Sequence, residues 1–577
     1  MKFVDIPYLS KQFHRKDYCL LNGIWNLVIL NELDNKIYEG KVNVPFGLET
    51  EDSGVNHILL KNEIAIYSLD FEKIDLKEDE TCLLHFLAVD QIAEVTLNGI
   101  NIGIHEGGYT PFEFDIGEHL KENNHLEVRV KDYTMDGPFS YGKQKIKRGG
   151  IWYTPTSGII QDVYLEKVKK NRITSIKVTP NVDGSNIELI VKTTSADKKC
   201  FLRINSNVVS CETNAKNVIA INNPNYWSPE KPYLYRIEVL FDKDIISSYF
   251  GFRKIEVKKD SQGIERVYLN NKPIFLSGLL DQGYYSSGYT AKDKEEYEND
   301  IKLIKKYGFN TLRKHIKLEH PYFYYLCDKY GVLVIQDFIN GGSKYKFRVI
   351  TVPALLPIKY DDTKYKAFGR LDEQGREFYK KESENIIDVL YNHPSVVAYT
   401  VFNEAWGQFD SKKMTEYFKG LDSTRLYDST SGWHDTKSGN FISRHVYFKK
   451  FKLKLDGTSR AFLLSEFGGY GLKINGHTFG EAYFCYKKTK DKKHFKNSIY
   501  KLYSHEIIPA IKKGLCGSIY TQLADVEDEL NGLVTFDRKE KITDDTLKKI
   551  NLQIEKEMKK IVNENLPLER FELPREE

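Results

Sequence analysis

The chain has 577 residues, with 85 basic and 81 acidic side chains and a formal net charge of +4. So small an imbalance gives no reason to expect a nucleic-acid or membrane partner. A hydrophobic content of 41% and a charged content of 29% exclude disordered and collagen-like chains. The length predicts several domains, one of them large.

Residues 1–169 have the pattern of an all-β domain. Short runs, such as 81–90 and 94–109, alternate apolar and polar residues, and this period of two is typical of strands. Asn98-Gly99 lies between two such runs and predicts a hairpin. No helical period intervenes, so we expect an antiparallel β-sandwich of jelly-roll size.

Residues 170–258 also consist of short strand-like runs. At least five further strand-like runs, including 186–194 and 232–241, occur in fewer than ninety residues, separated by Asn-Pro and Ser-Pro turns. This density of strands predicts a second, immunoglobulin-like β-sandwich.

From residue 259 to 577 strands and helices alternate. Helical periods are clearest at 292–308 (which ends at Gly308), 373–391, 411–420 and 541–562. Eight strand candidates over about 300 residues predict a (β/α)8 TIM barrel. They lie at 272–280, 310–316, 332–338, 395–404, 426–433, 441–447, 461–469 and 517–525.

The cysteines and the N-terminus indicate the compartment. Seven cysteines are scattered without any Cys-x-x-Cys pair, which argues against a disulfide framework and a zinc site. The first 25 residues contain no apolar run of signal-peptide length, and no segment approaches the ~20 apolar residues needed to span a bilayer. We therefore expect a cytoplasmic, soluble protein with no metal and no cofactor.

Two of the barrel strand candidates end in glutamate. The run 396–404 ends at Glu404, with Asn403 before it, and the run 461–466 ends at Glu466. Carboxyl ends of TIM-barrel strands face the active site, so these two side chains can meet across the barrel. A pair of carboxyl groups is what glycosidic cleavage needs, one as general acid and the other as a nucleophile or base.

These segments resemble glycoside hydrolase family 2, the β-galactosidase and β-glucuronidase group. The sequence around Glu404, NHPSVVAYTVFNEAWG (392–407), and SEFGG (465–469) resemble its acid/base and nucleophile segments. LNGIWN (21–26), GGYTPFEFDI (107–116) and YFGFRKIEV (249–257) resemble its two sandwich domains.

The resemblance implies a retaining exo-β-glycosidase that acts on a carbohydrate, with Glu404 as acid/base and Glu466 as nucleophile. A homodimer or higher homo-oligomer is the expected assembly, although neither the sequence nor the resemblance specifies it. Arg313 would keep Glu466 charged, Tyr447 would donate a hydrogen bond to it, and Asn403 would hold the sugar 2-hydroxyl. For each of these three residues the alternative is a structural role. Further expected sugar contacts are Trp433, His315, His445, Tyr520 and Asp281, with core packing as the alternative for the tryptophan and both histidines.

The sequence departs from the family where the sugar is recognised. Glucuronidases bind the uronate carboxylate through an Asn-x-Lys motif, but here the stretch reads Asn531-Gly532-Leu533. An unpaired buried carboxylate costs several kcal/mol, so glucuronidase activity is disfavoured unless Lys314 or Lys317 acts by another route. We therefore expect a β-galactosidase-like enzyme. The alternatives are a glucuronide, mannoside, fucoside or arabinopyranoside specificity, and a catalytically inactive carbohydrate-binding protein.

Overall fold

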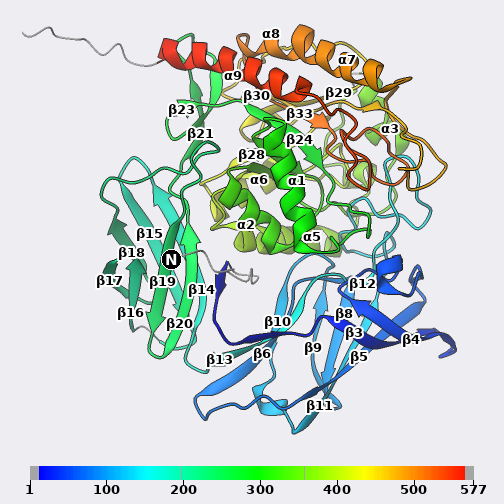
Figure 1. Cartoon of the computed structure of the whole chain (residues 1–577), viewed down its shortest axis with the longest axis vertical. Coiled ribbons are helices and arrows are strands. Elements are labelled where there is room, and N and C mark those ends of the chain that lie inside the picture. Colours follow the sequence, from blue (N-terminus) through cyan, green and yellow to red (C-terminus); the bar gives the residue numbers. More distant parts are fainter. Residues whose placement is uncertain (1–11, 197, 357, 566–577) are drawn as a thin grey trace, which may run out of the picture.

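A computed structural model describes residues 12–196, 198–356 and 358–565. The chain forms two β-sandwiches and a barrel; in Figure 1 the first sandwich (blue) lies below the barrel and the second (teal) to its left. This confirms the predicted fold class of jelly-roll sandwich, immunoglobulin-like sandwich and TIM barrel.

The first sandwich is built on a six-stranded antiparallel sheet in the order β4-β3-β5-β11-β8-β9. A four-stranded sheet, β10-β6-β13-β2, covers it, and alternating apolar residues such as Trp25, Tyr67 and Phe86 fill the core between the sheets. The strands are β2 (Tyr18–Leu20), β3 (Gly23–Asn31), β4 (Lys36–Val44), β5 (Glu63–Glu72), β6 (Glu80–Phe86), β7 (Val89–Asp90), β8 (Ile92–Leu97), β9 (Ile100–Glu106), β10 (Phe112–Asp115), β11 (Asn123–Lys131), β12 (Gly158–Ile159) and β13 (Val163–Lys169).

The predicted hairpin at Asn98-Gly99 is present between β8 and β9. Both residues have positive φ, 53° and 81°, as a two-residue turn of the favoured hairpin type requires.

The second sandwich pairs a five-stranded sheet, β1-β20-β19-β16-β17, with a three-stranded sheet, β14-β15-β18. Its first strand, β1 (Phe13–His14), comes from the N-terminal end of the chain and pairs with β20. The other strands are β14 (Ile173–Asn181), β15 (Asn186–Thr193), β16 (Lys199–Ile204), β17 (Asn207–Glu212), β18 (Lys216–Ala220), β19 (Tyr235–Phe241) and β20 (Asp244–Phe250).

The barrel is an eight-stranded parallel sheet in the order β28-β27-β26-β25-β24-β33-β30-β29. Asp428, the last residue of β28, forms a bridge with Gly439, two residues before β29, so the barrel is nearly closed. The strands are β24 (Leu276–Asp281), β25 (Thr311–Lys314), β26 (Leu333–Asp337), β27 (Val396–Thr400), β28 (Leu426–Asp428), β29 (Phe441–Val446), β30 (Ala461–Gly468) and β33 (Leu515–Thr521). A small sheet of β21 (Ile255–Lys259), β22 (Glu265–Leu269) and β23 (Lys272–Pro273) precedes it.

The barrel helices follow the predicted order. The helix predicted at 292–308 is α1 (Lys294–Lys306), and Gly308 behind it takes a φ of 83°. The helix predicted from residue 541 starts later, at Thr546. The other longer helices are α2 (Pro321–Tyr330), α5 (Glu373–Leu390), α6 (Ser411–Leu421), α7 (Lys492–Leu502) and α9 (Thr546–Asn565), with short turns α3 (Phe347–Ile350), α4 (Val352–Leu355), η4 (Tyr503–Ile507) and α8 (Ile508–Ile511).

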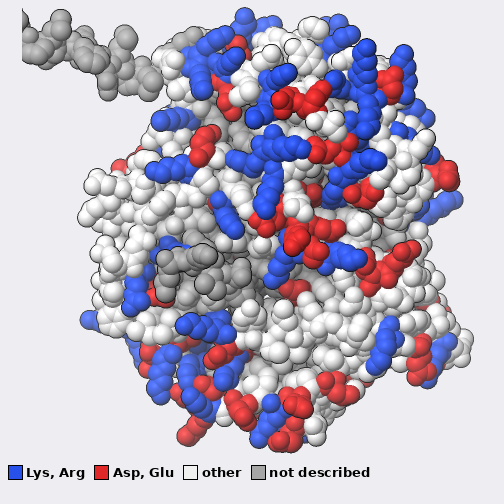
Figure 2. All heavy atoms as spheres, viewed as in Figure 1, with Lys and Arg blue, Asp and Glu red and all other residues white. Residues whose placement is uncertain are grey.

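The surface has no dominant charge. Lysine and arginine side chains are interspersed with aspartate and glutamate over the face in Figure 2, as the small net charge implies. Across the described residues, none of the helices combines the length and the apolar character that a membrane span requires.

Candidate active site

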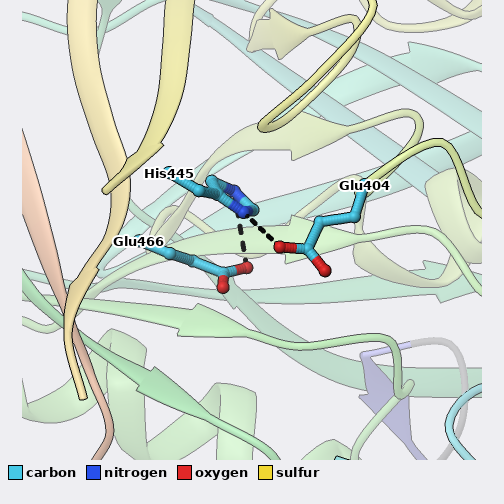
Figure 3. Close-up of side chains that lie close together, drawn as sticks. All are labelled: Glu404, His445 and Glu466. Carbon is cyan, nitrogen blue, oxygen red and sulfur yellow. Dashed lines mark hydrogen bonds and ion pairs between the residues drawn. The ribbon is translucent and has the colours of Figure 1, made fainter. Parts of the chain in front are cut away.

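Glu404 and Glu466 meet at the carboxyl-terminal end of the barrel. Glu466 lies within β30, and Glu404 follows β27 in a turn where its φ is 45° and that of Ala405 is 66°. Such left-handed backbone is unfavourable for residues with a side chain, and it persists only where the surroundings fix it. One oxygen from each carboxyl group lies within 4.8 Å of the other (Figure 3).

His445, on β29, lies between the two carboxyl groups (Figure 3). Its Nδ1 is 2.7 Å from Glu404 Oε1, and its Nε2 is 2.8 Å from Ser431 Oγ and 3.5 Å from Glu466 Oε1. Burial lowers the pKa of His445 to about 4. The imidazole is therefore neutral near pH 7, so one ring nitrogen donates a hydrogen bond and the other accepts one.

The proton affinity of Glu404 is high. Burial raises the pKa of Glu404 to about 7, while the charges of Lys143 and Arg313 oppose the rise. A carboxyl group with this pKa is partly protonated at neutral pH, which suits a general acid.

Glu466 has a different set of partners. Arg313 Nη1 donates to its Oε1 at 3.1 Å, and the Tyr447 hydroxyl donates a short hydrogen bond to its Oε2. Burial and the neighbouring Glu404 raise the pKa of Glu466, whereas Arg313, His445 and Tyr447 act in the opposite direction. These donors favour the carboxylate, so of the two groups Glu466 has the environment of an anion.

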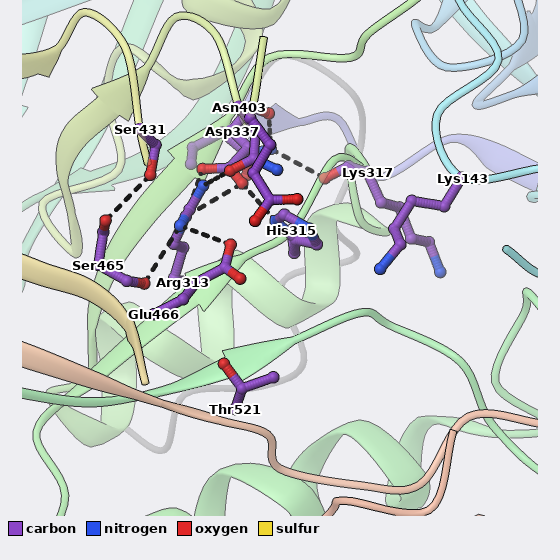
Figure 4. A network of polar contacts seen from close by, with 12 residues as sticks. Lys143, Arg313, His315, Lys317, Asp337, Asn403, Ser431, Ser465, Glu466 and Thr521 are labelled. Atoms are coloured by element: carbon purple, nitrogen blue, oxygen red, sulfur yellow. Dashed lines mark hydrogen bonds and ion pairs between the residues drawn. The ribbon is translucent and has the colours of Figure 1, made fainter. Parts of the chain in front are cut away.

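Arg313 is the centre of a wider network (Figure 4). The single N–H of Arg313 Nε is shared between the two carboxylate oxygens of Asp337, at the end of β26, at 2.9 and 3.1 Å, and Asp337 also contacts His315 Nδ1 at 2.7 Å. Arg313 Nη2 donates to Asn403 Oδ1 at 2.8 Å. This fixes the amide of Asn403 with its Nδ2 buried and, among the described residues, without a partner.

Two predicted sugar contacts are not at this site. Asp281 pairs with Lys314 across β24 and β25 and accepts from its Nζ at 2.7 Å, on the side of the sheet opposite Arg313. Tyr520 is buried against Phe467, outside the barrel. Side chains alternate along a strand, so it is the next residue, Thr521, that contacts the Tyr447 hydroxyl at 3.0 Å. Asp281 and Tyr520 therefore lie apart from Glu404 and Glu466.

Trp433 lies beside the site. Its ring meets His445 edge to face, with 5.4 Å between the ring centroids, and the side chain is partly exposed. The neighbouring His434 has a structural role, because it accepts from the Tyr360 amide and contacts the Val349 carbonyl.

Lys143, which reaches the barrel from the first sandwich, was not among the site residues expected from the sequence. Its ammonium group is buried above the rings of Tyr153 and Trp406, at 4.8 and 5.8 Å from their centroids. Tyr153 donates a hydrogen bond of 2.5 Å to Glu529, a barrel residue, which fixes the loop that carries Lys143. No strand-end pattern marks this loop, which precedes the barrel by more than a hundred residues.

Glu404, His445 and Glu466 each offer one ligand atom within 4.8 Å of the others, a spacing that a metal ion could use. Arg313 already places a positive charge 3.1 Å from Glu466. A metal cation at this point would be repelled by the guanidinium, so the charges do not fit a metal centre.

Comparison with known families agrees with this geometry. The description "Glycosyl hydrolases family 2, TIM barrel domain" matches residues 256–555. "Glycosyl hydrolase 2 galactose-binding domain-like" matches 39–170, and "Glycosyl hydrolases family 2" matches 160–253.

Among curated relatives, a putative β-glucuronidase of Formosa agariphila is 25% identical over 464 residues, which are 71% of this chain and 50% of the relative. A β-galactosidase of Clostridium acetobutylicum is 25% identical over 392 residues, 63% of this chain and 40% of the relative. The chain thus spans half or less of the length of these two relatives.

Solved structures share the fold. A β-D-glucuronidase of Dictyoglomus thermophilum superposes with a TM-score of 0.71 at 19% identity, covering 94% of this chain and 98% of the other. A β-galacturonidase of Eisenbergiella tayi gives 0.70 at 19% identity, covering 96% and 99%. Since the barrel description alone covers more than half of the residues, and the two sandwich descriptions precede it in order, the chain belongs to glycosyl hydrolase family 2.

Proposed function

We propose that the protein is a retaining exo-β-glycosidase that removes a terminal β-linked sugar by double displacement. The observation that carries the proposal is the pair Glu404 and Glu466. One oxygen of each carboxyl group lies within 4.8 Å of the other, and Glu466 accepts hydrogen bonds from Arg313 and Tyr447. Retaining enzymes hold their carboxyl groups about 5–5.5 Å apart, and inverting enzymes hold them farther apart to admit a water molecule.

In the first step Glu466 attacks the anomeric carbon, and Glu404 transfers its proton to the departing glycosidic oxygen. In the second step Glu404 accepts a proton from water, which attacks the same carbon and releases Glu466. Arg313 and Tyr447 hold Glu466 as the carboxylate between turnovers. The unpartnered Nδ2 of Asn403 is a donor for the 2-hydroxyl of the sugar, a contact that strengthens in the transition state.

The first-choice sugar is a β-galactoside. The supporting feature is that the lysine of the uronate-binding Asn-x-Lys motif is absent. Leu533 occupies its position and is buried, and the Asn531 side-chain amide donates a hydrogen bond to Glu529. A panel of p-nitrophenyl β-glycosides (galactoside, glucuronide, glucoside, mannoside, fucoside and arabinopyranoside) tests the proposal. Release of p-nitrophenol from at least one of these glycosides supports a glycosidase. If the folded protein cleaves none of them, the result would favour a carbohydrate-binding protein.

A second candidate, a β-uronide, is favoured by Lys143. The two lysines that the sequence offered are not free, since Lys314 pairs with Asp281 and Glu319, and Lys317 donates to the Gly283 and Tyr289 carbonyls. In contrast, Lys143 forms no ion pair with the described residues and lies where the charges of Glu404 and Glu466 reach it. A sugar carboxylate bound beside it would gain the charge partner that Leu533 cannot provide.

Lys143→Met tests this second candidate, because methionine keeps an apolar chain of similar length and removes the charge. If the substrate is a uronide, kcat/KM for the p-nitrophenyl uronide should fall about 10- to 100-fold, the loss expected for one charged hydrogen bond. The neutral galactoside should change far less.

Lys145→Met is the matched control, because Lys145 lies on the same loop and is partly exposed. An equal loss for the galactoside and the uronide with Lys143→Met would show that this lysine supports the catalytic groups and does not select the sugar.

A further inference from the structure

One cavity of the protein has His445, the histidine that contacts Glu404, in its wall. It has a volume of about 990 Å³ and lies among the end of β29 and the segment after it, the loop after β28, and the turn α4 with the segment that follows it. Its inner wall includes Gly432, Trp433 and His445, and His445 is the residue that contacts Glu404 at 2.7 Å. The volume is at the upper end of the range for ligand pockets.

The outer wall of this cavity is basic. Arg444 and six lysines line it, and all six lysines are exposed. Within the described residues none of these lysines takes part in an ion pair. The lysines are Lys359, Lys437, Lys449, Lys450, Lys452 and Lys454.

The acidic residues of the wall do not neutralise this charge. Asp435 and Asp456 also line the cavity, but Arg460 binds both, at 2.8 and 2.5 Å, and Arg444 pairs with Asp435 at 3.7 Å. These two arginines and two carboxylates balance, so the six lysines remain. The pKa values of His434 and His445 are lowered by burial, so neither histidine adds charge near pH 7. The lysines therefore give the cavity an uncompensated positive potential, which attracts anions.

Aromatic rings accompany these charges. Trp433 and Phe451 are partly exposed and line the same cavity. The indole Nε1 of Trp433 is buried and has no partner among the described residues, which leaves a donor at the inner end. Aromatic faces suit sugar rings, whereas lysines suit the sulfate or carboxylate groups that some sugars carry.

We propose that this cavity binds an anionic saccharide, sulfated or uronate-bearing, as the leaving part of the substrate. This inference rests on the proposed glycosidase function. In the proposed mechanism Glu404 donates a proton to the oxygen of the leaving group, so the leaving group lies beside Glu404. The cavity wall contains His445, which is bonded to Glu404, and Trp433, which packs against His445. We therefore place the cavity on the aglycone side of the site. The natural substrate is then an anionic oligosaccharide, whichever sugar occupies its terminal position.

The test compares disaccharides in which the sugar cleaved in the aryl panel is β-linked to glucose 6-sulfate, to glucuronate or to glucose. The wild type should cleave one or both anionic disaccharides with a kcat/KM about tenfold or more above the neutral one, and 0.5 M NaCl should remove most of this preference. The anionic disaccharide with the higher kcat/KM shows whether the cavity prefers a sulfate or a carboxylate.

The combined variant Lys449→Gln, Lys450→Gln, Lys452→Gln and Lys454→Gln should lose the preference through a higher KM and leave the p-nitrophenyl glycoside unaffected. The control replaces four exposed lysines of α9, Lys548, Lys549, Lys556 and Lys559, with glutamine. Equal cleavage of neutral and anionic disaccharides by the wild type would overturn the proposal, as would an unchanged preference in the pocket variant.

Failure of the glycosidase function is a separate result. If no aryl glycoside is cleaved, binding of a fully sulfated maltotriose is measured by calorimetry against unsulfated maltotriose. Binding of the sulfated sugar alone, lost in the pocket variant, would keep the anionic site and remove the catalytic role; no binding would refute both.

Discussion

Glu466→Gln should abolish turnover of every aryl glycoside that the wild type cleaves, with a loss on the order of 10⁴-fold or more. The amide is isosteric with the carboxylate but cannot form a covalent bond to the anomeric carbon. It also replaces the acceptor of Arg313 and Tyr447 with a group that carries no charge. Initial rates and thermal unfolding of the same preparations measure the effect.

Labelling identifies the nucleophile independently of the mutation. A 2-deoxy-2-fluoro glycoside of the cleaved sugar slows the second step, so the wild type should accumulate one sugar adduct on the peptide that contains β30. Tyr447→Phe is the matched variant, because it removes one donor to Glu466 and keeps the carboxylate. It should still form the adduct, at a lower rate. An adduct on another carboxyl group, or turnover by Glu466→Gln near the wild-type rate, would refute the assignment.

The fold could be predicted from periodicity because each part has its own period. Strand alternation marks both sandwiches, and all eight predicted barrel strands correspond to strands of the sheet. The pairing of β1 with β20 could not be predicted, since two residues near the start of the chain join a sheet more than 200 residues later. Nothing in a two-residue strand specifies its distant partner.

The site could be predicted only as far as the strand ends allowed. Glu404 and Glu466 follow apolar runs, so the barrel rule brought them together. Asp337 ends a strand in the same way and could have been found by that rule. Lys143 could not, because its position depends on how the first sandwich docks on the barrel through contacts such as Tyr153 to Glu529.

The directions in which Asp281 and Tyr520 point could not be predicted from the sequence, and the reason is the same for both. Each residue lies at the end of a barrel strand but faces outward, and a strand end shows the direction of its side chains only once the register is known. Asp281 is opposite Lys314, not Arg313, in the ladder between β24 and β25. Tyr520 is one residue before Thr521, which faces Tyr447.

Glu404→Gln should separate substrates by the acidity of their leaving groups. Glutamine cannot donate the proton that a poor leaving group needs, so kcat/KM for such substrates should fall about 10²- to 10⁴-fold. A 2,4-dinitrophenyl glycoside needs no protonation and should keep most of its kcat/KM, which reports the first step. In the second step the variant lacks the base that activates water, so kcat should fall. Azide should raise kcat, because it attacks the glycosyl-enzyme without needing a base.

The pH dependence gives a second readout of the same group. With the pKa of Glu404 raised to about 7, kcat/KM of the wild type for a poor leaving group should decline as pH rises through that value, because the acid loses its proton. In Glu404→Gln the residual kcat/KM for the same poor leaving group should lack this alkaline decline, because the titrating acid has been removed. Glu382→Gln is the matched control, since burial also raises the pKa of Glu382 to about 7 but its carboxyl group lies outside the catalytic network. A wild-type decline that survives in Glu404→Gln, or vanishes in Glu382→Gln, would assign the titrating acid to another residue.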